Sequence, residues 1–231
     1  MKIAILDLTT HPPKLGDKPR VADQIANWIR PAMPQADFWK VDIAEAGEPM
    51  PTPDQFDGLL LSGSEFGVYD DVPWMVPLRQ LLRDTKAAGK PIYGICFGHQ
   101  IMADVFGGKA EKVSDPIMGA RRFEMEDESF DAMVWHQDQV TEVPPGATVL
   151  SRSGYCPVGA LAYDFPAASV QFHPEYREEH LRELYDLFAG DEITHDQRAA
   201  ALESFASHDV KPDLQADEAA AFFRAHALQR T

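Results

Sequence analysis

Cysteine is scarce in this sequence, and its scarcity excludes one broad class of protein. The chain of 231 residues contains two cysteines, Cys96 and Cys156. Two thiols so far apart provide no disulfide framework of the kind that stabilises small secreted domains. Thiols that stay free are typical of a reducing compartment, so we expect a cytoplasmic protein.

Basic residues are few as well. The chain has 21 Lys and Arg against 37 Asp and Glu, which gives a formal net charge of -16. Nucleic acids and anionic membranes bind clustered positive charge, so we expect neither as a partner. The histidines outside the motifs described below have no metal-ligand spacing, and no P-loop occurs. We therefore expect no metal and no cofactor.

Long hydrophobic runs are also missing. No apolar stretch reaches the roughly 20 residues that a membrane-spanning helix needs. The apolar N-terminal stretch is short and is interrupted by Asp7, which argues against a signal peptide. A total of 45% hydrophobic residues nevertheless suffices for a sizeable core.

Strand-like and helix-like segments alternate over the first half of the chain. Short apolar runs predict strands, and apolar residues at helical spacing predict the helices between them. This alternation predicts an α/β fold with a mostly parallel sheet and helices on both faces. The expected strands cover residues 2–8, 37–43, 57–61 and 91–95, and the expected helices cover residues 21–29, 73–88 and 99–106.

The second half of the chain has a different pattern. Six short, turn-bounded segments between residues 109 and 172 predict a small antiparallel extension of the sheet, and residues 177–188 predict an amphipathic helix. Residues from about 191 onward are rich in Ala, Glu, Asp and His and predict two helices. We therefore expect one domain over residues 1–190 and a C-terminal helical extension over residues 191–231.

Cys96 lies in a pattern typical of a catalytic nucleophile. It stands in Gly94-Ile95-Cys96-Phe97-Gly98, after an apolar strand and before a helix. Such a sharp turn holds the nucleophile in strained backbone geometry, and small residues two positions on either side avoid collisions. The turn also places the thiol at a helix N-terminus, which favours the thiolate.

A candidate base lies at the end of a later predicted strand. His173 is followed by Pro174 and Glu175. A thiol nucleophile needs an imidazole that takes up its proton, and the imidazole needs a carboxylate that fixes its tautomer. We therefore expect Cys96, His173 and Glu175 to be catalytic.

A third turn follows the strand at residues 57–61. Gly63 stands between Ser62 and Ser64, where a glycine lets backbone amides approach a substrate closely. The N–H groups of Gly63 and Phe97 are the expected oxyanion hole.

These motifs resemble those of the class I (triad-type) glutamine amidotransferases. The sequence GICFGHQ, the sequence QFHPE and the turn LLLSGSE carry the resemblance, over roughly residues 1–190. The chain is most similar to standalone members, such as the glutaminase domain of GMP synthase and the plant γ-glutamyl peptidases. A segment from 68 to 74 is also frequent in standalone members, with no role that we can assign from sequence.

The resemblance implies a flavodoxin-like sheet and a defined chemistry. The family attacks the side-chain amide of glutamine, forms a γ-glutamyl thioester, releases ammonia and hydrolyses the thioester. It implies that Gln100 holds the glutamyl group. It also implies that a loop containing His136 and Asp138 meets the α-amino and α-carboxylate groups of this small-molecule substrate.

Two departures limit what the resemblance implies. Many family members carry a glycine pair where this chain has Ser62-Gly63-Ser64. No synthase domain accompanies the glutaminase motifs, so the ammonia would go to water or to a separate synthase partner. The physiological substrate and the acceptor stay open at this stage.

Four hypotheses compete. The chain is a glutamine-hydrolysing amidotransferase, a γ-glutamyl peptide hydrolase, a non-catalytic regulatory relative or a thiol esterase of the α/β-hydrolase kind. The complete Cys-His-Glu set argues against a non-catalytic role. The short spacing from His173 to Glu175 argues against the esterase, in which the acid precedes the histidine.

Overall fold

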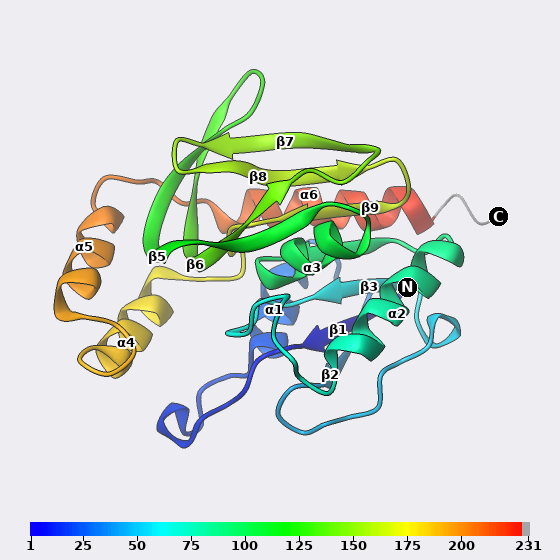
Figure 1. Ribbon diagram of the computed structural model, residues 1–231, viewed down its shortest axis with the longest axis horizontal. Coiled ribbons are helices and arrows are strands. Elements are labelled where there is room, and N and C mark those ends of the chain that lie inside the picture. Colours follow the sequence, from blue (N-terminus) through cyan, green and yellow to red (C-terminus); the bar gives the residue numbers. More distant parts are fainter. Residues whose placement is uncertain (228–231) are drawn as a thin grey trace.

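One mixed β-sheet of nine strands runs through the part of the protein that the computed structural model describes, residues 1–227 (Figure 1). The strand order is β2-β1-β3-β4-β9-β8-β7-β5-β6. Neighbours from β2 to β9 pair in parallel, and neighbours from β9 to β6 pair antiparallel. The predicted α/β class, with a parallel sheet and an antiparallel part, is therefore confirmed. The parallel strands are β1 (Lys2–Asp7), β2 (Asp37–Asp42), β3 (Gly58–Leu61), β4 (Ile92–Ile95) and β9 (Ala167–Val170).

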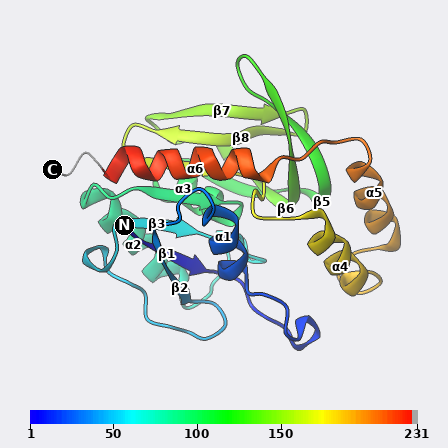
Figure 2. The same ribbon diagram turned by 180° about the vertical axis from the view of Figure 1, so that it is seen from behind.

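Helices cover both faces of the parallel strands, because the side chains of β1 alternate between two cores. Ile3 and Ile5 pack in one core with α1 (Val21–Ile29) and α6 (Pro212–Ala227). Ala4 and Leu6 pack in the other core with α2 (Met75–Ala87) and α3 (Phe97–Val105). Figure 2 shows α1 and α6 on the near face of the sheet. Burial on both faces explains why these strands are apolar throughout.

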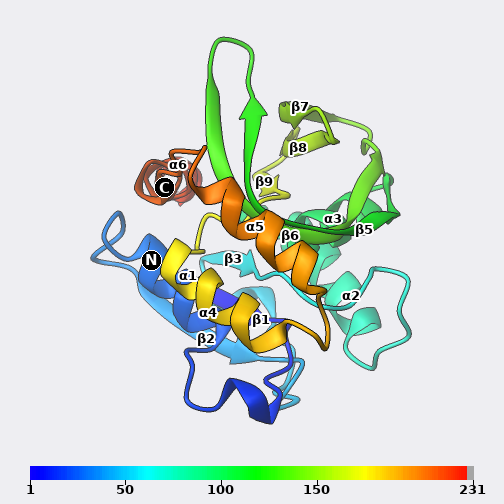
Figure 3. The ribbon, with the colours of Figure 1, turned by 90° about the vertical axis from the view of Figure 1, so that its left-hand side faces the viewer.

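The antiparallel strands support a third cluster of helices. Helix α4 (Glu178–Phe188) and helix α5 (His195–Phe205) pack side by side, and α5 packs against β5 (Figure 3). Their core joins Tyr185 and Phe205 to Met118 and Met133. The antiparallel strands are β5 (Lys109–Glu124), β6 (Ser129–Glu142), β7 (Ala147–Ser153) and β8 (Cys156–Tyr163). Two 3-10 turns, η1 (Pro13–Leu15) and η2 (Pro53–Gln55), lie in loops.

The structure differs from the expected elements in two places. Strands β5 and β6 are long and continuous, whereas the sequence predicts separate short strands. Pro116 lies inside β5 and the pairing shifts register between Lys112 and Ile117, so a bulge accommodates the proline. Helix α3 begins at Phe97, two residues before the expected start, because the turn at Cys96 passes directly into the helix.

The segment after residue 190 forms helices that pack on the rest of the chain. Phe223 of α6 is fully buried and lies against Gly58 of β3. The indole N–H of Trp28 donates a hydrogen bond of 2.9 Å to the carbonyl of Pro212. The division at residue 190 stays a prediction. Within residues 1–227, no helix is both long and apolar enough to cross a membrane.

Candidate active site

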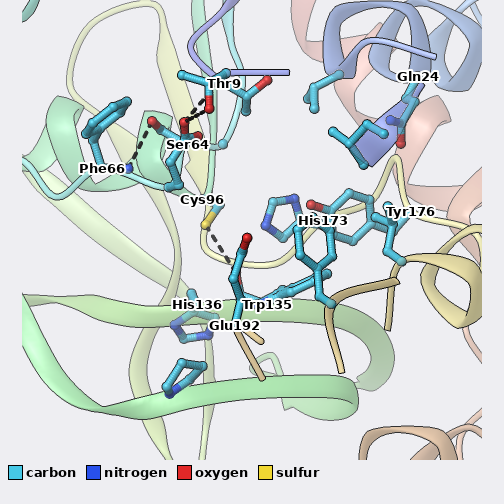
Figure 4. A pocket seen from close by; sticks show the side chains of 18 of the residues that line it. Thr9, Gln24, Ser64, Phe66, Cys96, Trp135, His136, His173, Tyr176 and Glu192 are labelled. Atoms are coloured by element: carbon cyan, nitrogen blue, oxygen red, sulfur yellow. Dashed lines mark hydrogen bonds between the residues drawn. The ribbon is translucent and has the colours of Figure 1, made fainter. Parts of the chain in front are cut away.

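A cavity of about 350 Å³ opens at the carboxyl ends of the parallel strands (Figure 4). Gly63 follows β3, Cys96 follows β4 and His173 follows β9, and all three line this cavity. Parallel α/β sheets commonly bind ligands at this edge, because several strand ends meet there. The structure thus brings together residues that are far apart in the sequence.

Cys96 adopts the strained backbone geometry that the sequence predicts for a nucleophile turn. Its φ is 52° and its ψ is -102°, and within residues 1–227 it is the one non-glycine residue with positive φ. Such a conformation is costly for a residue with a Cβ atom and persists where the surroundings enforce it. The turn places the thiol at the N-terminus of α3.

The two glycines around Cys96 are required by close packing. A Cβ atom at Gly94 would lie 2.6 Å from the backbone carbon of Gly98. A Cβ atom at Gly98 would lie 2.8 Å from the Cβ of Leu61. Both distances are too short for real contacts, so larger residues would push α3 away from β3 and β4.

His173 and Glu175 form a buried pair. Nδ1 of His173 lies 2.7 Å from Oε1 of Glu175, and each residue is 3% exposed. Burial lowers the pKa of His173, but the charges of Glu175 and of the Cys96 thiolate outweigh it and raise the pKa to about 10. The geometry therefore favours an imidazolium that is held by a carboxylate.

The other ring nitrogen of His173 is directed to the nucleophile side of the site. His173 Nε2 is buried and has no hydrogen-bond partner within the described chain. A Cβ atom built on Gly63 would lie 3.7 Å from this nitrogen and 3.6 Å from the Cβ of Cys96. Gly63 is thus packed against both residues, and Figure 4 shows His173 beside Cys96.

Two backbone amides next to the thiol are free to bind a substrate oxygen. Neither the N–H of Gly63 nor that of Phe97 donates a hydrogen bond to another described residue. The carbonyl of Ser62, which precedes Gly63, accepts from the amide of Gly98 at 3.1 Å. This bond fixes the two turns relative to each other and so preorganises both donors.

Gln100, His136 and Asp138 also line the cavity. Nε2 of Gln100 donates to the carbonyl of Asp138 at 2.8 Å and to Oε1 of Gln171 at 3.2 Å. Burial lowers the pKa of His136 to about 4, so its ring is neutral at pH 7. Burial also raises the pKa of the Asp138 carboxyl group.

One expectation about these residues is wrong. The family resemblance implied a loop for His136 and Asp138, whereas both lie inside strand β6. The pairing of β6 with β5 is irregular near Asp138, because the register shifts between Lys112 and Ile117. The strand continues through this irregularity to Glu142.

Comparisons with known proteins agree with this geometry. The family model described as glutamine amidotransferase class-I matches residues 22–188. The chain belongs to the class I glutamine amidotransferase family. The chain is 34% identical to gamma-glutamyl peptidase 5 of Arabidopsis thaliana over 148 residues, which are 58% of this chain and 59% of that protein.

A second relative carries a different name. One subunit of the glutamine-hydrolyzing GMP synthase of Thermococcus kodakarensis is 41% identical over 110 residues, which are 43% of this chain and 58% of that protein. The matches thus span less than two thirds of both relatives. A glutamine amido transferase from Methylobacillus flagellatus superposes with a TM-score of 0.76 at 22% identity, over 98% of this chain and 94% of the other, which shows a shared fold.

Three residues contact the site without having been identified from sequence. The ring of Tyr176 stacks on His173, with centroids 4.1 Å apart and planes 4° apart. Nε2 of Gln171 lies 3.7 Å from Sγ of Cys96. The hydroxyl of Tyr69 donates to Oδ1 of Asp138 at 3.2 Å, which gives the segment from 68 to 74 a contact with the site. Gln171 and Tyr176 lie within three residues of His173 in the sequence, and this closeness is the signal that could have identified them.

The second thiol has a different environment. Cys156 is fully buried, and burial raises its pKa to about 12. It lies on β8 and does not line the cavity. Within residues 1–227, no three His, Cys, Asp or Glu side chains are grouped so that they could hold a metal ion.

Proposed function

We propose that this glutamine amidotransferase hydrolyses the γ-glutamyl amide bond with Cys96 as nucleophile, His173 as base and acid, and Glu175 as the residue that positions His173. The observation that carries the proposal is the buried His173. Its Nδ1 is held at 2.7 Å by Glu175, while its Nε2 has no hydrogen-bond partner in the described chain and lies beside the strained Cys96 turn.

The first half of the reaction forms a thioester. His173 holds, as an imidazolium, the proton that Cys96 has given up, and the Sγ thiolate attacks the γ-carbonyl carbon of the substrate. A C–S bond forms while the carbonyl oxygen becomes negatively charged near the free amides of Gly63 and Phe97. The C–N bond then breaks, and Nε2 of His173 gives its proton to the leaving amine.

The second half regenerates the enzyme. A water molecule gives a proton to His173 and attacks the thioester carbon. The C–S bond breaks, and Cys96 leaves as the thiolate beside the His173 imidazolium, which restores the starting pair. Free glutamate leaves. Glu175 keeps its negative charge throughout and stabilises the imidazolium form in both halves.

Gln100, His136 and Asp138 are the proposed contacts of the glutamyl group. The Asp138 carboxylate can pair with the substrate's α-ammonium group. The neutral ring of His136 lines the cavity beside it, and its two nitrogens contact the carbonyl of Asp138 at 3.0 Å and the hydroxyl of Tyr155 at 3.2 Å, which fixes the ring in place. The bond from Gln100 to the carbonyl of Asp138 would hold this edge of the cavity in place.

The fate of the amine distinguishes two candidate activities. Similarity to part of a GMP synthase favours glutamine as substrate, with ammonia released to water or to a synthase partner. Similarity to a gamma-glutamyl peptidase favours a γ-glutamyl peptide. A cytoplasmic location remains part of the proposal, because the reaction needs the Cys96 thiol in its reduced form.

The test measures glutamate release from glutamine and from γ-glutamyl peptides by the complete chain. We expect turnover of at least one substrate class, and loss of more than about 10³-fold in Cys96→Ala, since the covalent step is removed. Cys156→Ala is the matched control and should stay active. Full activity of Cys96→Ala would overturn the proposal, as would failure to turn over either class.

A further inference from the structure

The lining of the catalytic cavity includes a group of apolar side chains, which we call the apolar compartment. Leu15, Trp135, Leu184, Phe188 and Ile193 line it, and the same residues belong to the cluster that joins α4 and α5 to the sheet. Glutamine itself ends in a small polar amide, which gains nothing from such a surface. The compartment therefore fits a substrate that extends beyond the scissile bond with an apolar group.

Charge pairs connect the segments that contribute lining residues to this compartment, namely the loop between β1 and α1, helix α4 and the turn after α4. Lys14, in the loop between β1 and α1, pairs with Asp191 at 3.2 Å and also with Glu192. Lys18 of the same loop pairs with Glu183 of α4. Figure 3 shows this loop next to α4. The loop and the α4–α5 turn thus form a preorganised wall, which lowers the entropic cost of binding.

Two of the apolar lining residues lie outside the segment that the family model matches. The model matches residues 22–188, whereas Leu15 and Ile193 precede and follow that range. The matched segment contains the reactive groups, so these groups and part of the apolar lining come from different stretches of the chain. Loop residues at the edge of a site are suited to determining which amine is accepted.

Lys18 is the one Lys or Arg among the described residues that line the cavity, and it is paired with Glu183. The lining carboxylate of Glu192 is paired with Lys14. Burial lowers the pKa of His180, which keeps its ring neutral at pH 7. A carboxylate on the amine half of a substrate would be desolvated in this compartment. No unpaired positive side chain among the described lining residues would compensate for that cost.

We propose that this compartment binds the amine half of the substrate, and that the preferred substrates are γ-glutamyl amides of uncharged apolar amines. The inference rests on the proposed function, since the same Cys96 and His173 perform the cleavage. Leu15 is then a specificity-determining residue, because it is a partly buried apolar residue that lines the cavity, packs on the α4–α5 cluster and is not among the proposed contacts of the glutamyl group.

The experiment compares kcat/KM for three substrates with the complete chain. γ-Glutamylmethylamide lacks an apolar group, γ-glutamylphenethylamide adds an aromatic ring, and γ-glutamylphenylalanine adds the ring together with a carboxylate. We expect the phenethylamide to exceed the methylamide by about tenfold or more, since each well-packed apolar group contributes this much in a hydrophobic pocket. We expect γ-glutamylphenylalanine to fall below the phenethylamide.

Two variants connect this preference to the compartment. Leu15→Ala should lower the ratio of kcat/KM for the phenethylamide over the methylamide by about tenfold. Leu214→Ala, a matched change at a position that is 59% exposed on α6, should leave the ratio unchanged.

The outcomes separate this inference from the proposed function. Equal kcat/KM for the phenethylamide and methylamide, an unchanged ratio in Leu15→Ala, or a preference for γ-glutamylphenylalanine would each overturn the inference while leaving Cys96 catalysis intact. Absence of turnover with all three substrates and with glutamine would overturn both.

Discussion

Gly63 offers the sharpest test of how closely the catalytic groups are packed. A Cβ atom at this position would lie 2.8 Å from Cε1 of His173, whereas ordinary contacts begin at 3.4 Å. In Gly63→Ala the imidazole must therefore move by about 0.6 Å, because the backbone of the turn is fixed by the bond from Gly98 to Ser62.

The expected cost of this shift can be estimated for both activity and stability. A displacement of ~1 Å at a reacting group lowers rates ~100-fold, so Gly63→Ala should lose about 10- to 100-fold in kcat/KM. Overpacking of ~1–3 kcal/mol should lower Tm by about 3–9 °C for a chain of this size. Alkylation of Cys96 by iodoacetamide should slow, because the displaced His173 stabilises the thiolate less well.

Gly154→Ala is the matched control for Gly63→Ala. A Cβ atom at Gly154 meets nothing within 4 Å, so stability should change by less than about 0.5 kcal/mol and activity should stay intact. Steady-state kinetics and thermal unfolding, measured side by side, show whether Gly63→Ala loses more activity and stability than Gly154→Ala. If Gly63→Ala retained activity within twofold of Gly154→Ala, the close packing of Gly63 on His173 would be refuted.

Two further variants probe the charge pair and the C-terminal helix. Glu175 helps to raise the pKa of His173 to about 10, and the imidazolium that protonates the leaving amine is lost as pH rises through that value. Glu175→Gln should therefore move the alkaline limb of the pH–rate profile to lower pH and reduce kcat by about 10²- to 10⁴-fold. An alkaline limb at the same pH in Glu175→Gln would contradict this. Phe223 is fully buried against Gly58, so Phe223→Ala should lower the free energy of unfolding by about 3–5 kcal/mol in chemical denaturation. Leu214→Ala, at an exposed position of the same helix, should change this free energy little. Equal changes in the two variants would mean that α6 is not part of the core.

Local sequence patterns predicted the parts of the site that depend on local geometry. Gly94, Cys96 and Gly98 imply a sharp turn because only small residues fit there, and the structure has that turn with φ of 52° at Cys96. The alternating strands and helices likewise implied the parallel sheet. These features follow from backbone sterics and apolar periodicity over a few residues.

Contacts between distant segments were not predictable in the same way. Tyr69 donates a hydrogen bond to Asp138, and Leu15 packs on the cluster of α4 and α5. The segment from 68 to 74 was noticed without a role, and the neighbourhood of Leu15 shows no motif, since such contacts depend on where the sheet places each loop. Strand β5 was predicted as separate short strands, whereas it is continuous. Its pairing with β6 shifts register between Lys112 and Ile117, the stretch that contains Pro116, and such an irregularity is not visible in the sequence.

The central claim is that Cys96 carries a γ-glutamyl thioester during turnover. Mass spectrometry of the intact protein, quenched in acid during hydrolysis of a γ-glutamyl amide, measures this intermediate directly. We expect a mass increase of one γ-glutamyl group, located by peptide mapping on Cys96, retained in Cys156→Ala and absent in Cys96→Ala. A γ-glutamyl adduct on any other residue, or turnover by Cys96→Ala, would contradict the account.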